Sequence, residues 1–463
     1  MKKSLILIIC LFVLSAGIFY FAFSWVSEGK EAISVEETVL YGDRNAAEGI
    51  TVRNQIHCGF HMFWDTEYTV DRELAVKTHY RYSQIEQRED EIRPSDMQIY
   101  TYINYAMSGT IDLSDQKSYE LPLLAAADVA KRTPSGETHE ELLSLADYYQ
   151  FYPVSMDLYL SEGRKILYNE QKDMADYFKI PVSQDHKVRV SVTKDKNGSV
   201  SYIEQNSEKG DINISAGSAV VAAGGGYCAV SVTNDIGNQV RLPENLSGIH
   251  FLPFSETKDG LEPSFQEMRR VYLLSENVRV LRLMKDPEEE RLLLFTKEND
   301  TILLSVIDMN TMELIQKTEL GKDAAELELW DVKKYDSFLV PVFSDYHFTL
   351  LSRDSDGLFR MEFAGNLGQD KAIAEKFQLQ DAVMDYDGVR LAVAVYQPYT
   401  SFRQSSGEYQ YFSSHSTYLM VFDREGLLYA GKYDQSSDEL IPEVNNDKSL
   451  RAVDKNPLTV RFE

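Results

Sequence analysis

The sequence predicts a mainly β protein with one N-terminal transmembrane helix and a small helical insertion. Three observations support this fold class. Residues 4–26 form an uncharged apolar run, short apolar segments separated by polar turns fill most of the remaining chain, and helix-like patterns are confined to about residues 119–180. The chain therefore divides into an anchor, a large β domain and an insertion within that domain.

The anchor segment reads SLILIICLFVLSAGIFYFAFSWV, from Ser4 to Val26, and contains no charged side chain. A helix of this length spans the roughly 30 Å hydrocarbon core of a membrane. A cleaved signal peptide is the alternative, but its apolar core usually has about 7–15 residues. Here the apolar run continues beyond the small residues Ser15 to Gly17. We therefore expect an uncleaved signal anchor.

The charges on either side of the anchor predict its orientation. Two lysines precede the apolar run, whereas acidic residues dominate the segment that follows it. The positive-inside rule places residues 1–3 in the cytoplasm and everything after Val26 outside. We expect a single-pass plasma-membrane protein with a linker at 27–36 and an extracytoplasmic domain over 37–463.

The chain as a whole is strongly acidic. It has 47 Lys and Arg residues against 73 Asp and Glu residues, which gives a net charge of −26. Such a surface repels phosphate groups, so we expect no nucleic acid as partner and no anionic lipid surface. Contact with the membrane is expected through the N-terminal helix alone.

The segment GITVRNQIHCGFHMFWDTEYTVD, residues 49–71, holds two histidines, a cysteine and two carboxylates close together. Apolar and polar residues alternate through it, and its Ile, Phe, Trp, Thr, Tyr and Val residues favour strands. In a strand, Cys58 lies on the face opposite His57 and His61, which does not suit a shared zinc ion. We predict a half-buried strand. Cys228 is the other cysteine after the anchor, and we expect both cysteines to be buried free thiols.

The C-terminal half contains an internal repeat. Each copy has an apolar strand, a polar turn, a second strand, a tight polar turn and a third strand, with one further strand before the copy. Four short antiparallel strands in about 40–50 residues are typical of a β-propeller blade. The C-terminal LTVRFE suits a strand that closes such a ring by pairing the two chain ends. The copies begin at Arg291, Ser337 and Val389, and the further strands are VRVLRLM, AELELWDV and KFQLQDAVM.

A helical insertion is predicted at about residues 119–180. LPLLAAADVAKRT is helix-like, and residues 138–141 form a capping box before LLSLADYYQ, whose apolar residues share one helical face. With this stretch, its anchor and its repeat, the chain resembles uncharacterised membrane-anchored β-propeller-like exported proteins of Gram-positive gut bacteria. The resemblance implies a fold and carries no function.

Two phosphate or metal motifs are incomplete. The glycines at 224–226 lack the helix and the lysine that a phosphate-binding loop needs, so we predict a turn between two strands. DSDG at 354 and DYDG at 385 lack the glutamate that ends a calcium loop, so we predict turns stabilised by aspartate side chains. Neither motif predicts a cofactor or a metal ion.

Two catalytic patterns also fail. His139 and Glu140 begin a zinc-protease motif, but Leu143 occupies the place of its second histidine. Asp65 and Glu67 are two carboxylates on one predicted strand face, whereas a glycosidase needs two carboxyl groups across a cleft. The sequence therefore predicts no catalytic residue, no cofactor and no metal ligand.

One segment of the third repeat copy is a candidate binding loop. It reads YTSFRQSSGEYQYFSS, residues 399–414, and aromatic residues beside Ser, Gln and Arg form contact surfaces for proteins or sugars. The alternative is a longer hairpin whose aromatic residues pack on a neighbouring blade. The candidate residues are Tyr399, Phe402, Arg403, Tyr409, Tyr411 and Phe412.

These observations favour a membrane-anchored extracytoplasmic binding or assembly protein that takes a protein or glycan ligand on its outer face. Two alternatives stay open. One is a carbohydrate-active enzyme that gathers carboxylates from several blades around a channel, and the other is a ligand-sensing domain that acts through a membrane partner. Fold class alone does not decide among them.

Overall fold

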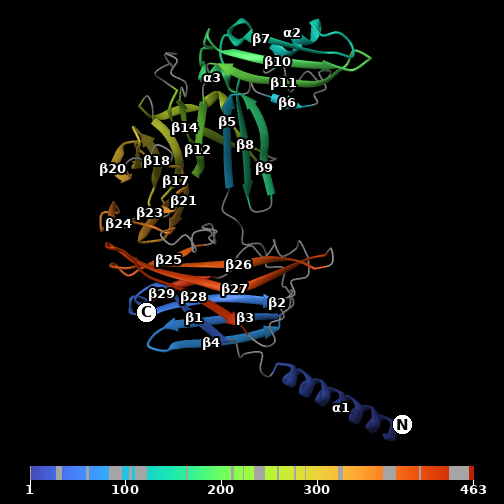
Figure 1. Cartoon of the computed structure of the whole chain (residues 1–463), viewed down its shortest axis with the longest axis vertical. Helices are drawn as coiled ribbons and strands as arrows, with labels where there is room; N and C mark the ends of the chain where they lie inside the picture. Colours follow the sequence, from blue (N-terminus) through green and yellow to red (C-terminus); the bar gives the residue numbers. More distant parts are fainter. Residues whose placement is uncertain are drawn as a thin grey trace. The chain divides into compact units, whose positions relative to one another are not determined.

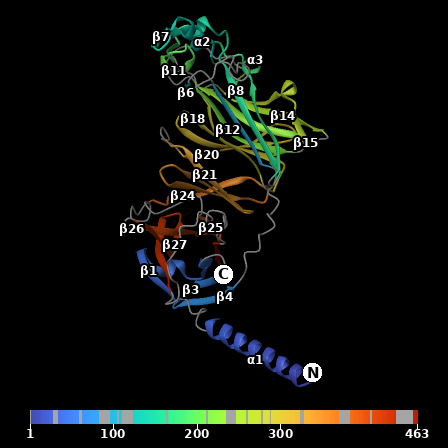
Figure 2. The same ribbon diagram turned by 90° about the vertical axis from the view of Figure 1, so that its right-hand side faces the viewer.

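The structure is a computed structural model of the chain, shown in Figure 1 and, turned by 90°, in Figure 2. It describes residues 2–27, 34–58, 62–82, 96–103, 107–109, 123–162, 165–209, 213–222, 224–233, 246–257, 260–275, 278–286, 288–321, 327–368, 382–405, 408–436 and 458–463. The chain divides into two compact units. The first unit comprises residues 1–89, 330–353 and 360–463, and the second comprises 90–329 and 354–359.

Three antiparallel sheets make up most of the first unit, together with the short 3-10 helix η1 (Arg44–Ala47). Its strands are β1 (Ser34–Gly42), β2 (Ile50–Cys58), β3 (Met62–Val70), β4 (Leu74–Tyr82), β21 (Leu329–Lys334), β22 (Phe338–Phe343), β23 (His347–Arg353), β24 (Phe359–Asn366), β25 (Val383–Tyr386), β26 (Leu391–Ser405), β27 (Glu408–Asp423), β28 (Gly426–Ser436) and β29 (Thr459–Phe462). The strand orders are β29–β2–β3–β4, β21–β22–β23–β24 and β1–β28–β27–β26–β25.

The second unit contains the other sheets. Its strands are β5 (Asp96–Ile103), β6 (Met107–Gly109), β7 (Thr138–Ser144), β8 (Val154–Glu162), β9 (Lys165–Asp173), β10 (Lys187–Lys194), β11 (Val200–Lys209), β12 (Asn213–Ala222), β13 (Gly225–Thr233), β14 (Gly248–Thr257), β15 (Gly260–Pro263), β16 (Arg269–Leu273), β17 (Val278–Lys285), β18 (Arg291–Glu298), β19 (Thr301–Asp308) and β20 (Leu314–Gly321). They form the sheets β5–β8–β9, β6–β11–β10–β7, β12–β13–β14–β15 with β16 on β14, and β17–β18–β19–β20.

Helices are few in the described part of the second unit. They are α2 (Leu124–Arg132), α3 (Ala175–Phe178) and the 3-10 helices η2 (Leu145–Asp147) and η3 (Phe265–Glu267). Figure 1 shows α2 beside β7 and β10, where its residues Ala125, Ala126 and Val129 are fully buried. The helix predicted for LPLLAAADVAKRT is thus confirmed for residues 124–132.

The chain is mainly β, with several four-stranded antiparallel sheets consistent with propeller blades. The repeat predicted from the C-terminal half is confirmed, because its three copies coincide with β18–β20, β22–β24 and β26–β28. Its turns form as their sequences indicate. Asp308 Oδ1 accepts hydrogen bonds from the backbone nitrogens of Asn310 and Thr311, each at 2.8 Å. Asp423 and Gly426 close a two-residue turn, in which Gly426 has a φ of +123°.

The two ends of the β domain are held by strand pairing inside the first unit. β29 pairs with β2, from Ile50 opposite Phe462 to Arg53 opposite Thr459. β1 adds to the edge of β28, from Ser34 opposite Ser436. The predicted pairing of LTVRFE with an N-terminal strand is therefore confirmed.

The helix predicted after the capping box at residues 138–141 is wrong. Residues 138–144 form strand β7, which pairs with β10 from Thr138 opposite Thr193 onwards. The edge of β10 offers this segment a complete hydrogen-bond ladder. Its acidic residues also find cations on neighbouring elements, since Glu140 lies 2.5 Å from Arg189 and Glu141 lies 2.7 Å from Arg132. Pairing with a neighbouring strand thus overrides the local helix preference.

The strand predicted over residues 49–71 is confirmed as β structure, but it is two strands. β2 and β3 pair antiparallel from Ile50 opposite Val70 to Cys58 opposite Met62. Residues 59–61 lie outside the described residues, as do the side chains of His57 and Cys58.

Helix α1 (Lys2–Ser27) covers the predicted anchor. Its described apolar side chains are exposed, with Phe12 and Phe19 each at 75%. In the part of the chain that the structure describes, no helix has both the length and the hydropathy needed to cross a membrane. The transmembrane anchor stays a prediction.

Candidate docking arm

The predicted binding segment at 399–414 is part of one long hairpin formed by β26 and β27. β25 pairs with β26 only over 391–394, and β28 pairs with β27 only over 416–423. Residues 398–405 and 408–415, which we call the arm, therefore pair only with each other among the described residues. Figure 1 shows the two strands as the longest pair, coloured red. The segment is a regular hairpin instead of an irregular loop.

The register of the arm divides the candidate residues between its two faces. Residues directly opposite each other in an antiparallel pair share a face, and successive residues alternate. Phe402 is opposite Tyr411 and Gln404 is opposite Tyr409, which defines the Phe402 face. The other face, which we call the Arg403 face, contains Tyr399, Arg403 and Phe412, opposite Ser414, Gln410 and Ser401 respectively. The structure does not describe the side chains of these residues.

A buried polar layer lies at the root of the arm. Asn54 of β2 donates a hydrogen bond through Nδ2 to the hydroxyl of Thr417 in β27, at 3.1 Å. Its Oδ1 accepts one from Nε2 of Gln435 in β28, at 2.9 Å. These three side chains are 3%, 0% and 7% exposed. They tie three strands of two sheets together next to the point where the arm begins.

A chain of tyrosines continues this layer towards β1. The hydroxyls of Tyr433 and Tyr429 are 2.7 Å apart, and Tyr429 donates to Oε1 of Glu37, also at 2.7 Å. Arg44 donates through Nε to the same carboxylate at 2.8 Å. This hydrogen bond raises the pKa of Arg44. The carboxylate of Glu37 is therefore compensated by a cation and by a hydroxyl.

Burial holds these tyrosines in their neutral form. The ring of Tyr433 stacks on that of Tyr68, with centroids 4.8 Å apart. Burial is the main cause that raises the pKa of Tyr68, of Tyr429 and of Tyr433. A Cβ at Gly431 would lie 1.9 Å from the Tyr429 hydroxyl, so this position requires glycine. The root thus contains a packed cluster of neutral tyrosines.

The second unit contains a histidine between two hydroxyls. His186 is fully buried, with Nδ1 2.9 Å from the Tyr152 hydroxyl and Nε2 3.0 Å from the Ser207 hydroxyl. Burial lowers its pKa from 6.5 to about 4. A serine beside a neutral imidazole resembles a nucleophile with its base. However, both ring nitrogens are engaged inside the core, which is also what a structural histidine requires.

A second buried histidine faces a cysteine across two strands. His250 is opposite Cys228 in the β13–β14 pairing, and its Nδ1 lies 2.8 Å from the Tyr177 hydroxyl. Burial lowers the pKa of His250 to about 4 and raises that of Cys228 to about 12. A thiol in this environment stays protonated and is a poor nucleophile. The prediction that Cys228 is a buried free thiol is confirmed.

The turn predictions for the glycine and aspartate motifs are confirmed. The glycines at 224–226 lead from β12 into β13, and a Cβ at Gly226 would lie 2.3 Å from the Met97 sulfur. Asp354 Oδ1 accepts hydrogen bonds from two backbone nitrogens of its turn, and Asp387 Oδ1 does the same in the second motif. Close packing and turn geometry account for these residues.

Two carboxylates of β3 form hydrogen bonds and ion pairs with side chains of the neighbouring strands. Asp65 accepts a hydrogen bond from Gln55 at 2.5 Å, and Glu67 pairs with Arg53 and, at 3.2 Å, with Lys77. Burial opposes ionisation of Glu67, but the hydrogen bonds from Lys77 and Arg53 outweigh it and lower its pKa. A carboxylate with a lowered pKa is unsuited to act as a general acid.

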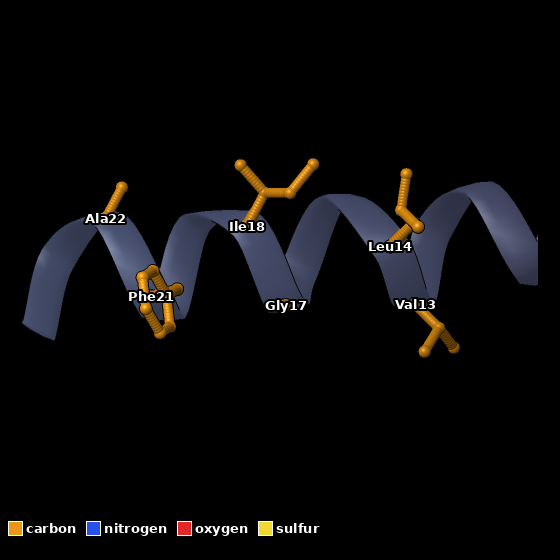
Figure 3. Close-up of a pocket in the computed structure, with 6 residues that line it drawn as sticks. All are labelled: Val13, Leu14, Gly17, Ile18, Phe21 and Ala22. Atoms are coloured by element: carbon orange, nitrogen blue, oxygen red, sulfur yellow. The ribbon is translucent and has the colours of Figure 1, made fainter.

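An open apolar depression lies on α1. It is shown in Figure 3 and is lined by Val13, Leu14, Gly17, Ile18, Phe21 and Ala22. A Cβ at Gly17 would meet no atom within 4 Å. The depression is therefore formed by residues of α1 alone.

Comparisons with known proteins identify no family. No family model matches the chain, and no curated protein matches its sequence. Among solved structures, the chain is similar to the β-propeller domain of Cps50 (Swd1) from Myceliophteria thermophila, with 10% identity and a TM-score of 0.25 over 64% of this chain and 87% of that one. A protein from Lactobacillus plantarum matches with 9% identity and a TM-score of 0.27 over 90% of this chain and 99% of that one. Hsv2 from Kluyveromyces lactis matches with 9% identity and a TM-score of 0.20 over 44% of this chain, and the chain spans 57% of its length.

Proposed function

We propose that this protein is a membrane-anchored extracytoplasmic assembly protein and that its arm docks a protein partner. One observation carries the proposal: among the described residues, β26 and β27 continue as a paired hairpin beyond the residues that pair with β25 and β28. A two-stranded hairpin is only marginally stable alone in water. A hairpin of this kind is favoured where a partner covers it.

The composition of the arm supports a protein as the partner. Tyrosine, phenylalanine and arginine are enriched at the centres of protein interfaces, where they give most of the binding energy. The Phe402 face gathers Phe402, Tyr409 and Tyr411, and contains no Lys, Arg, Asp or Glu residue among its arm positions. The charged residues Arg403 and Glu408 lie on the other face. We assign the contact to the Phe402 face.

The root explains how such an arm can act as a docking element. Its hydrogen bonds join β2 to β27 and to β28 directly below the arm. An arm fixed at its base needs less ordering when a partner binds, and this lowers the entropic cost of association.

The sequence of α1 supports the membrane anchor in this proposal. A 26-residue helix is about 39 Å long at 1.5 Å per residue, which exceeds the thickness of a hydrocarbon core. Lysines at its start favour an orientation with the N-terminus in the cytoplasm and the β domain outside the plasma membrane. A partner for the arm is then another protein of the cell envelope.

Crosslinking in native membranes tests this function. The full-length protein is compared with F402S/Y411S, which removes two aromatic residues from the Phe402 face, and with Y399S/F412S, which removes two from the Arg403 face. We expect one stoichiometric crosslinked species whose yield falls about ten-fold in the first variant only. Equal yields from all three proteins would contradict the proposal. Binding of soluble glycans by the wild type, lost in the same variant, would instead favour a glycan ligand.

A further inference from the structure

The sheet β5–β8–β9 of the second unit, shown in Figure 1, has one buried face and one outward face. On β5, Met97 and Ile99 are buried, whereas Gln98 and Tyr100 are exposed. β8 alternates in the same way, and its buried residues on this face are Val154, Met156, Leu158 and Leu160. Because residues directly opposite each other share a face, the register identifies the outward side chains of all three strands.

Three tyrosines and several polar residues make up the outward face. Tyr100 lies opposite Asp157, and Asp157 lies opposite Gln171 on β9. Tyr102 belongs to the next row on one side of them, and Tyr159 belongs to the next row on the other side. The other members of these three rows are Gln98, Ser155, Asn169 and Asp173. We call these nine positions the tyrosine face, and none of them is an aliphatic residue, a lysine or an arginine.

Hydrogen bonds order the centre of the tyrosine face. Gln171 donates through Nε2 to the Tyr102 hydroxyl at 2.5 Å, and this hydroxyl donates to Oδ1 of Asp157 at 3.4 Å. Burial is the main cause that raises the pKa of Tyr102, so its hydroxyl stays neutral. The Tyr100 hydroxyl donates to Oε1 of Gln98 at 3.3 Å, while the residue as a whole is 59% exposed. Side chains that are ordered in advance lose less entropy when a ligand binds.

We propose that the tyrosine face binds a neutral oligosaccharide. A tyrosine ring offers an apolar surface for the C–H face of a sugar, and carboxylate and amide groups exchange hydrogen bonds with sugar hydroxyls. Tyr100 and Tyr102 are two residues apart on one strand, so their Cα atoms are about 7 Å apart. Tyr159 is a diagonal neighbour of Tyr100, at about 7–8 Å. Three rings with this spacing extend beyond one sugar unit, so the ligand is a chain of several units.

Charge complementarity favours a neutral saccharide as the occupant. The tyrosine face contains the carboxylates of Asp157 and Asp173 and no cation, in a chain with a net charge of −26. Anionic glycans and nucleic acids are therefore repelled, whereas uncharged hydroxyl groups donate to the carboxylates. The centre of a protein interface is usually enriched in arginine and methionine and depleted in aspartate, which is the opposite of this composition. A basic peptide is the alternative that the experiment must separate from a saccharide.

This inference goes beyond the proposed docking function and does not rest on it. The tyrosine face belongs to the second unit, whereas the arm belongs to the first. The variant F402S/Y411S should therefore keep the saccharide affinity of the wild type, even where its crosslink to a membrane partner is lost. Loss of saccharide binding in that variant would place the binding site on the arm and overturn the assignment to the tyrosine face.

Isothermal titration calorimetry of the full-length protein, in a detergent without a sugar head group, tests the site. The neutral probes are cellohexaose, mannohexaose and chitohexaose, and the charged probes are hexagalacturonate and hexalysine. Y100A removes the most exposed ring of the tyrosine face, and Q171A removes the amide that donates to Tyr102. Y202A is the matched control, because Tyr202 is a 40% exposed tyrosine on β11, in another sheet of the same unit.

The wild type is expected to bind at least one neutral hexasaccharide and not to bind hexagalacturonate. The dissociation constant should rise about ten-fold in Y100A and about five-fold in Q171A, while Y202A keeps the wild-type value. Absence of binding by all three neutral probes would overturn the proposal, and so would an equal loss of affinity in Y202A. Binding of hexalysine alone, weakened by Y100A, would overturn it in favour of a basic peptide.

Discussion

Two hairpins occupy equivalent places in neighbouring repeat copies, but only one of them has an arm. β22 and β23 have 6 and 7 residues, whereas β26 and β27 have 15 and 16. Every residue of β22 is buried, and so are residues 391–395 of β26. Among the described residues, only the inner half of the long hairpin pairs with other strands. The outer half is the arm.

The largest expected effect on stability comes from comparing two phenylalanines, one in each half of β27. Phe422 is fully buried and packs edge-on against Phe348, with ring centroids 5.0 Å apart. F422A should lower the free energy of unfolding by about 3–5 kcal/mol. F412A, in the arm of the same strand, should change it by less than about 0.5 kcal/mol. Urea unfolding followed by circular dichroism measures both, and equal losses would show that the arm belongs to the core.

Acid should destabilise the second unit more than the root of the arm. Burial lowers the pKa of His186 and His250 from 6.5 to about 4. Between these pH values the unfolded chain binds protons that the folded chain excludes. The free energy of unfolding is therefore not reduced by the two histidines above about pH 6.5. It falls as pH drops towards 4, by at most about 3 kcal/mol for each histidine. The polar layer at the root consists of Asn54, Thr417 and Gln435, whose side chains do not titrate between pH 7 and pH 5, so we expect this layer to respond less to acid.

Hydrogen exchange at pH 7 and pH 5, corrected for intrinsic rates, resolves this difference. Protection should fall in β10 and β14, next to the two histidines, while residues 417–423 of β27 keep theirs. A parallel loss in both places would mean that acid acts on the whole chain through its carboxylates.

A smaller effect is expected from the polar layer at the root. N54A removes the oxygen that accepts a hydrogen bond from Gln435 and the N–H group that donates one to Thr417. Both of these partner side chains are buried. Leaving buried polar groups without these bonds should cost about 2 kcal/mol in the free energy of unfolding. Q410A changes an amide of the arm and should cost less than about 0.5 kcal/mol in the same urea titration. A neutral N54A would show that the root does not fix the arm.

The sequence predicts the repeat because each strand combines β-favouring residues with a turn of known chemistry. In β18 and β22 an almost continuous apolar run agrees with burial on both faces. Asp308 ends β19 and Asp354 follows β23, and each aspartate side chain accepts hydrogen bonds from its turn. Local preference misleads at residues 138–149. There, the partner strand β10 is distant in sequence, so a local capping pattern gives no information about it.

The sequence marks the candidate segment but does not show how its residues are arranged. Composition marks residues 399–414 as unusual, whereas the division of their aromatic residues between two faces depends on the register with β27. Asn54, Thr417 and Gln435 were missed, because single polar residues in apolar strands look like ordinary surface positions. Asn54 follows Ile50 and Val52 at alternate positions, and a polar residue on a buried face is the signal that could have revealed the layer.

Removing the whole arm should affect stability less than N54A does. Residues 398–415 are replaced by Asn-Gly, so that Gln397 and Ser416, a hydrogen-bonded pair, close a two-residue turn. The pairings of β26 with β25 and of β27 with β28 stay intact, because they lie entirely outside the deletion. The free energy of unfolding in urea should therefore change by less than about 1 kcal/mol. A loss of several kcal/mol would mean that the aromatic residues of the arm pack on a neighbouring blade, and the long hairpin would then be a stabilising element instead of a docking arm.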